Sequence, residues 1–220
     1  MPKIILVPTS HIAKESIQRV KEAIDKEKPD LVAVEMDINR FMAMRKGEAS
    51  SNLEIIKTLG VTTFLVYFIF KSIQKWLGKK VNIFPGSEMM QAVKIAEKKG
   101  LKIAFIDRDI RETFLRIKEI SRREKLKLVW FVVKGLTLGF VLPGKKHKID
   151  LSKVPSKDLI NQAMKLLRKE FPELYRALVE ERDTYMSKML MQLSKQFKTI
   201  VAVVGAGHYD GLIKRLSMKN

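Results

Sequence analysis

The sequence predicts an α/β fold in which a small, mainly parallel central sheet is flanked by helices. Three observations support this prediction: short apolar runs rich in β-branched residues, helical patterns between them, and polar residues directly after each run. Nearly continuous apolar runs are typical of strands buried on both faces of a parallel sheet. Four such runs occur, at Ile4 to Val7, Leu31 to Val34, Ile103 to Ile106 and Thr199 to Val204. Their alternation with helical segments predicts right-handed crossover connections.

The segments between these strands carry helical signals. Apolar residues three or four positions apart predict a helix over 13–26, and Ser87 is a suitable N-cap for a helix that Gly100 ends. Further helices are predicted over 109–118 and 159–193, the latter restarting at Pro172. The long gaps between strands predict one domain over 1–220 with helical insertions around 52–80 and 120–196. The most apolar parts of these insertions, 61–77 and 126–142, could pack together or form a partner surface, and a homodimer through 61–70 is plausible.

Composition narrows the function classes. The 220 residues include no cysteine, which excludes disulfides and thiolate zinc sites. A formal net charge of +19 favours anionic partners such as a membrane surface. Most lysines lie among glutamates on predicted helical faces, so a solvated surface is the simplest interpretation. The densest basic group, 144–148, has no interleaved aromatic residues, so we do not expect nucleic-acid binding.

No export signal is visible, and the uncharged stretch 59–70 is shorter than the roughly 20 residues a membrane span needs. We therefore expect a cytoplasmic domain.

Polar side chains follow every predicted strand at its carboxyl end. Because ligands of open parallel sheets bind outside these ends, the four segments should converge on one rim. They contain the residues Ser10, His11, Glu35, Asp107, Arg108, Gly205, Gly207 and His208. The two glycines allow a tight strand-to-helix turn and close approach of the backbone to a ligand.

Two histidines and a carboxylate at one rim suggest a catalytic divalent metal. His11, Glu35 and His208 would be the ligands, and Glu88, at a predicted helix start, could be a further ligand or the general base. Such a metal would activate water and polarise a carbonyl group. Two alternatives stay open: a metal-free polar site, and histidines that only cap helices or bind the backbone.

The charged run Glu181, Arg182 and Asp183 lies within a predicted helix. A solvated helix face is one interpretation of this run. The other is that part of it turns inward because its neighbours are apolar. In that case Arg182 would bridge to Asp107 or Glu35 and hold the rim together.

Six motifs, in order along nearly the whole chain, resemble those of the TraB/PrgY family. They are TSHIAKES at 9–16, VEMDINR at 34–40, GSEM at 86–89, IDRDI at 106–110, ERDTYM at 181–186 and VVGAGH at 203–208. The family is similar to the Tiki proteases and the erythromycin esterase/ChaN-like proteins, which share two Gly-x-x-His motifs. The resemblance implies the fold of that superfamily.

The resemblance also implies an activity and its residues. His11 and His208 would be the two motif histidines, and Glu35 and Glu88 fall where the family has acidic residues, with Arg40 in the second motif. This chain has Pro8 where the family pattern has glycine, and proline fixes φ and removes an amide donor. The implied function is a hydrolase of peptides or small molecules that uses Mn, Co or Zn. The alternative is a non-catalytic regulator that binds a peptide or signal, of the pheromone-shutdown type. Many archaeal relatives look like this domain followed by membrane-spanning helices, so membrane anchoring within a longer protein is a further expectation.

Overall fold

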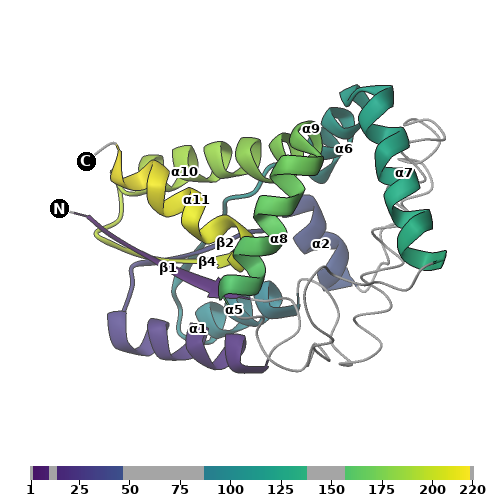
Figure 1. The fold of residues 1–220 in the computed structure, drawn as a ribbon. Coiled ribbons are helices and arrows are strands. Elements are labelled where there is room, and N and C mark those ends of the chain that lie inside the picture. Colours follow the sequence, from purple (N-terminus) through teal and green to yellow (C-terminus); the bar gives the residue numbers. More distant parts are fainter. Residues whose placement is uncertain (1, 10–13, 47–86, 138–156, 219–220) are drawn as a thin grey trace.

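The computed structural model describes residues 2–9, 14–46, 87–137 and 157–218 (Figure 1). The strands are β1 (Lys3–Thr9), β2 (Leu31–Val34), β3 (Lys102–Phe105) and β4 (Thr199–Gly205). The helices are α1 (Lys14–Glu27), α2 (Ile38–Lys46), α5 (Ser87–Lys98), α6 (Ile110–Glu119), α7 (Arg122–Thr137), α8 (Lys157–Glu170), α9 (Pro172–Tyr175), the π-helix η1 (Arg176–Glu180), α10 (Glu181–Leu193) and α11 (Ala206–Ser217). The α/β prediction is confirmed, and each predicted strand differs from the observed one by at most two residues at either end.

The four strands form one parallel sheet in the order β1-β4-β2-β3. The last strand is therefore inserted between the first two. The register pairs Thr9 with Gly205 across β1 and β4, and Val34 with Val203 across β2 and β4. Because all strands run the same way, their carboxyl ends open on a single edge of the sheet.

Helices cover both faces of the sheet (Figure 1). On one face, α1 and α5 pack against apolar side chains such as Val32, Val34 and Val203. On the other face, α10 and α11 pack against the alternate side chains, including Ala33, Ala202 and Val204. Residues of β2 and β4 are 0–2% exposed, apart from the β4 ends, because both of their faces are covered. This double burial explains why these runs are apolar without alternation.

A smaller apolar cluster joins α6, α7 and α9 away from the sheet. Phe114, Ile117, Phe171 and Leu174 form its centre. A small hollow there is lined mainly by the same side chains, so it is a packing defect of this cluster and is separate from the rim. On its outer side, α7 leaves Leu126 and Trp130 exposed.

Several predicted features fall on other parts of the chain. The first insertion at 52–80, the segment 61–70 on which the predicted homodimer depends, and the basic group at 144–148 lie outside the described residues. The described residues within 120–196 form α7 to α10. Within the described ranges, no helix is both long and apolar enough to cross a bilayer.

Candidate functional site

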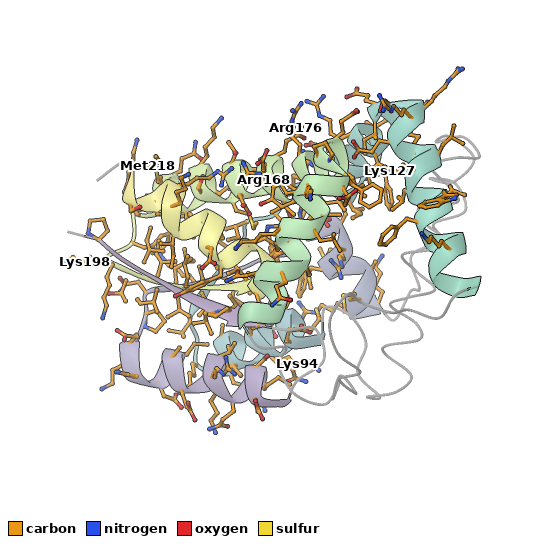
Figure 2. All side chains as sticks on the ribbon, viewed as in Figure 1. Lys94, Lys127, Arg168, Arg176, Lys198 and Met218 are labelled. Atoms are coloured by element: carbon orange, nitrogen blue, oxygen red, sulfur yellow. The ribbon has the colours of Figure 1, made fainter. Side chains whose placement is uncertain are left out.

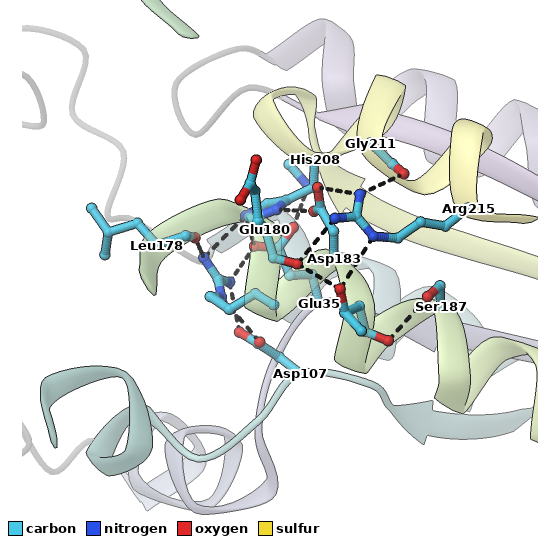
Figure 3. A network of polar contacts seen from close by, with 12 residues as sticks. Glu35, Asp107, Leu178, Glu180, Asp183, Ser187, His208, Gly211 and Arg215 are labelled. Carbon is cyan, nitrogen blue, oxygen red and sulfur yellow. Dashed lines mark hydrogen bonds and ion pairs between the residues drawn. The ribbon is translucent and has the colours of Figure 1, made fainter. Parts of the chain in front are cut away.

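Side chains from four parts of the chain meet at the carboxyl edge of the sheet. Glu35 directly follows β2, Asp107 follows β3, and His208 lies in the first turn of α11 after β4. Arg182 reaches them from α10, on the helix layer above. Figure 3 shows Glu35, Asp107 and His208 gathered around one network of polar contacts. The convergence that was predicted from the common direction of the strands therefore holds for these three residues.

Arg182 joins the two carboxylates, making both of the contacts that were predicted as alternatives. Its Nη2 lies 2.5 Å from Glu35 Oε1 and 2.6 Å from Asp107 Oδ2, and its Nε donates to Asp107 Oδ1 at 3.1 Å. Burial by itself would lower the pKa of Arg182, but the Glu35 and Asp107 carboxylates outweigh it and raise that pKa above its ordinary value. The guanidinium is thus a permanent positive charge at the rim.

His208 is held in one orientation by Asp183. Its Nδ1 lies 2.6 Å from Asp183 Oδ1, and both side chains are almost fully buried. A carboxylate accepts only, so Nδ1 carries the hydrogen and Nε2 keeps its lone pair. That lone pair accepts from Arg182 Nη1 at 3.0 Å. The imidazole therefore presents Nε2 to the rim as an acceptor or ligand atom.

Glu35 is fixed from both its backbone and its side chain. Its backbone N–H donates to Val203 O, and its Oε2 accepts the Gly205 N–H at 2.6 Å. A Cβ added to Gly205 would lie 3.2 Å from that same oxygen, so the close approach depends on glycine. Gly207 serves a different contact, because a Cβ there would meet the end of the Met164 side chain on α8.

Glu35 and His208 are spaced as two ligands of one metal ion would be. Glu35 Oε1 and His208 Nε2 lie 3.3 Å apart. Two ligands at about 2.0–2.2 Å from a tetrahedral ion are separated by roughly this distance. Asp183 supplies the carboxylate behind the histidine that such ligands commonly have. Among the described residues, no group of three or more histidine and acidic side chains could hold a metal, so the pair needs a further ligand.

The predicted third ligand, His11, lies outside the described residues, as does Ser10. The strand that leads to it is nevertheless informative. β1 is the direct parallel neighbour of β4, and Thr9, the last residue of β1, is level with Gly205. Thr9 is 1% exposed and its hydroxyl donates to Val204 O at 3.3 Å. The chain therefore leaves β1 at the same edge of the sheet, beside the strand that precedes His208.

Glu88 and Arg40 lie on other elements. Glu88 is 3% exposed in the first turn of α5, the helix that packs on the sheet face opposite α10. Arg40 lies in the first turn of α2, where its backbone N–H donates to Asp37 Oδ1 at 2.9 Å. Burial, followed by the like charges of Asp109 and Asp107, raises the pKa of Asp37.

Arg108 and Glu181 form a second ion pair beside the rim, with Arg108 Nη1 2.9 Å from Glu181 Oε2. Arg108 is 7% exposed and also binds Thr113 Oγ1 and Ala177 O. Asp109, for its part, caps α6 by accepting the Arg111 N–H at 2.8 Å. This cluster of paired charges braces the loop that carries Asp107.

Two features of the site were missed in the sequence. One is η1, whose wide turn is followed by Arg182; carbonyls of its residues 177, 178 and 180 accept hydrogen bonds from Arg108, Arg182 and Arg215 respectively. The other is the Asp183–His208 pair, to which Arg215 adds a contact of 3.4 Å with Asp183. Asp183 is one of three consecutive charged residues on a helix, Glu181 to Asp183, so no signal singled it out as the partner of His208. π-turns often occur at functional sites.

Comparison with known proteins confirms the family resemblance that the sequence motifs indicated. The family model for the TraB/PrgY/gumN family matches residues 2–219. An uncharacterised protein of Methanocaldococcus jannaschii is 37% identical over 216 residues, which are 97% of this chain and 53% of that protein. TraB domain-containing proteins of Bos taurus and Homo sapiens are each 28% identical, over 96% and 98% of this chain and 62% and 63% of their own length. The chain thus spans between half and two thirds of these relatives. Since the family model covers almost all of it, the chain belongs to the TraB/PrgY/gumN family.

Proposed function

We propose that this chain is a divalent-metal-dependent hydrolase whose substrate is a peptide or a related small molecule. The observation that carries the proposal is the 3.3 Å spacing of Glu35 Oε1 and His208 Nε2, with the imidazole oriented by Asp183. His11, Glu35 and His208 would hold the metal, which would be Mn, Co or Zn. When bound, such an ion lowers the pKa of a water molecule and polarises a carbonyl oxygen.

The residues of the chain each have a separate task in this proposal. Asp183 keeps the hydrogen on Nδ1 of His208, so that the lone pair of Nε2 stays available to bind a metal ion. The Gly205 N–H holds Glu35 Oε2 and leaves Oε1 directed at the rim. Glu88 is proposed to accept the proton of the attacking water at its carboxylate. The burial of Glu35 and His208 excludes bulk water and strengthens these interactions.

Metal analysis tests the first step. Purified chain dialysed against Zn, Mn or Co is expected to retain about one ion per molecule, measured by inductively coupled plasma mass spectrometry. His11→Ala and His208→Ala should each lose most of that metal, because each removes a ligand. His147→Ala is the matched control, since the third histidine of the chain is not a predicted ligand. Retention that is equal in all four proteins, or absent from the unaltered chain, would exclude the proposed ligand set.

Peptide cleavage tests the second step. The metal-loaded chain should cleave members of a mixed peptide library, and Glu88→Gln should lower the rate by about 10²-fold or more while metal content is kept. Chain that binds metal but leaves every peptide and ester probe intact would remove the hydrolase proposal.

A second candidate is a non-catalytic regulator that binds a peptide or signal. The observation in its favour is Arg182, whose guanidinium already lies against both Glu35 and His208. Because this guanidinium also pairs with Asp107, it joins the described side chains of the rim without any metal. Peptide binding that is unaffected by chelators, without turnover, would favour this candidate over the hydrolase.

We also propose that the outer face of α7 contacts an anionic membrane surface. Leu126 is 67% and Trp130 is 60% exposed, one turn apart on a helix whose exposed charges are all basic. The cations are Arg122, Arg123 and Lys134; Lys127 is also basic but pairs with Glu170 at 2.8 Å, and the single acidic residue of α7, Glu124, is buried. Basic helices with exposed tryptophan and leucine bind at the lipid interface.

Vesicle flotation tests this contact. The chain should float with vesicles that contain phosphatidylserine, less so as salt rises, and not with neutral vesicles. Replacing Leu126 and Trp130 together by serine should abolish flotation. Leu115→Ser on α6 is the control, because Leu115 is 53% exposed but lies on another helix. If the variant with both α7 changes still floats, the membrane contact lies elsewhere on the chain. If the chain binds nucleic acid and no vesicles, the membrane proposal is excluded.

A further inference from the structure

Arg182 occupies the place where a metal ion would meet its two best-placed ligands. Nη1 lies 3.0 Å from His208 Nε2, and Nη2 lies 2.5 Å from Glu35 Oε1. Those two donor atoms are 3.3 Å apart. An ion bound to both would lie within contact distance of the guanidinium, and the like charges would repel strongly in a site buried from water. The guanidinium and a divalent ion therefore compete for the same two atoms.

The arginine has other anchors that do not use those atoms. Nε and Nη2 form a fork on Asp107, at 3.1 and 2.6 Å, and Nη1 donates to Leu178 O at 3.3 Å. A small rotation of the side chain could release Glu35 and His208 while the fork on Asp107 is kept. Asp107 would then neutralise the displaced charge.

The charges of the network agree with this exchange. Glu35, Asp107 and Asp183 are three carboxylates, and Arg182 and Arg215 are the two guanidinium groups in contact with them. These five side chains leave an excess of one negative charge among the described residues. Two arginines therefore nearly balance the network, and a divalent ion, as a third cation, can enter only where one of their charges is moved aside.

We propose that Arg182 is a built-in competitor for the metal and that Asp107 is the carboxylate that receives it when the metal binds. This inference depends on the metal site of the proposed function, and it adds how that site is controlled. In the absence of metal, Arg182 keeps Glu35 and His208 paired and the fold stable. On metal binding, Arg182 shifts towards Asp107, which makes the affinity of the site depend on both residues.

Metal affinity tests the proposal, because two variants are expected to change it in opposite directions. The affinity for Zn, Mn and Co is measured by competition with a chromogenic chelator. Arg182→Met keeps the length of the side chain and removes its charge, so affinity should rise by about tenfold or more. Asp107→Asn removes the receiving carboxylate, so affinity should fall by a similar factor. Arg215→Met is the matched control: Arg215 belongs to the same network but contacts Asp183, and its removal should change affinity much less. Thermal unfolding in chelator should show Arg182→Met to be less stable than the unaltered chain.

The outcomes separate the competitor role from a structural one. A folded Arg182→Met with unchanged or weaker affinity would overturn the inference, as would Asp107→Asn with affinity equal to or above that of the unaltered chain. If Arg182→Met fails to fold, the affinity of Asp107→Asn still tests whether Arg182 competes with the metal. Tighter binding in Arg182→Met without peptide cleavage would leave the inference standing and remove only the hydrolase. Metal binding in none of the proteins would remove the metal site and the inference together.

Discussion

At the scale of single residues, Gly211 shows how closely the helices around His208 are packed. A Cβ at this position would lie 2.0 Å from Asp183 Oδ2 and 2.9 Å from its Cγ. Asp183 is 2% exposed and is the residue that orients His208, so it has little freedom to move aside. The absence of a side chain at Gly211 is thus a requirement of the site.

Gly211→Ala should therefore lower the free energy of unfolding by about 1–3 kcal/mol, because α10 and α11 must separate or Asp183 must change rotamer. Chemical denaturation followed by circular dichroism measures this. Gly207→Ala is the comparison: its Cβ would meet only the flexible end of Met164, at 3.0 Å, and the loss should be smaller. Equal losses in both variants would show that the contact with Asp183 is not the cause.

The residues of the site differ in how far the sequence reveals them. Glu35, Asp107 and His208 follow strands, and the direction of parallel strands is enough to bring them to one edge. Arg182 could be proposed because its helix has apolar neighbours. Asp183 could not be assigned to His208, since three adjacent charged residues on a helix point in three directions and only the packing of α10 on α11 selects one.

At the scale of elements, the continuous helical segment α9–η1–α10 carries the side chains that reach the rim from above. Its beginning has no cap of its own, because Phe171 at the N-cap position offers no side-chain hydrogen bond. Glu124 of α7 replaces that cap: its carboxylate accepts the Leu174 N–H at 2.8 Å and the Glu173 N–H at 3.2 Å. Helix α7 thus fixes where this segment starts.

Glu124→Ala should lower stability by about 1–3 kcal/mol, because two N–H groups at a buried helix start lose their acceptor. Glu124→Gln keeps an acceptor oxygen and should lose less. Glu119→Ala is the control, as Glu119 is an exposed partner of Arg116 and its removal should cost about 0.5 kcal/mol or less. Thermal melts of the three variants provide the measurement; a loss in Glu124→Ala no larger than in the control would exclude the capping role.

The strands and most helices could be predicted at this scale because apolar runs and helical spacing are local signals. The π-helix η1 could not be predicted. Its residues, Arg176 to Glu180, have an ordinary helical composition. Three arginines from other elements bind its carbonyls, and these contacts are not visible in the local sequence.

At the scale of the whole molecule, the basic charge is spread over many elements. Figure 2 shows Lys94, Lys127, Arg168, Arg176 and Lys198 projecting from the ribbon on different helices and before β4. This agrees with the solvated surface that the sequence indicated, and α7 adds two of the most exposed large apolar side chains, Leu126 and Trp130, one turn apart. The order of the strands was beyond sequence reasoning, because nothing local says that the last strand enters the middle of the sheet.

Because of that strand order, the rim can form only after β4 has joined the sheet. β1 pairs with β4 and with no other strand of the described sheet, and β2 meets β1 only through β4. Until β4 has paired, β1 has no neighbour in the described sheet and Glu35 lacks the Gly205 amide. A chain in which β4 has not yet entered the sheet therefore keeps Glu35 and His208 apart, although these residues and β1 are already present in the sequence.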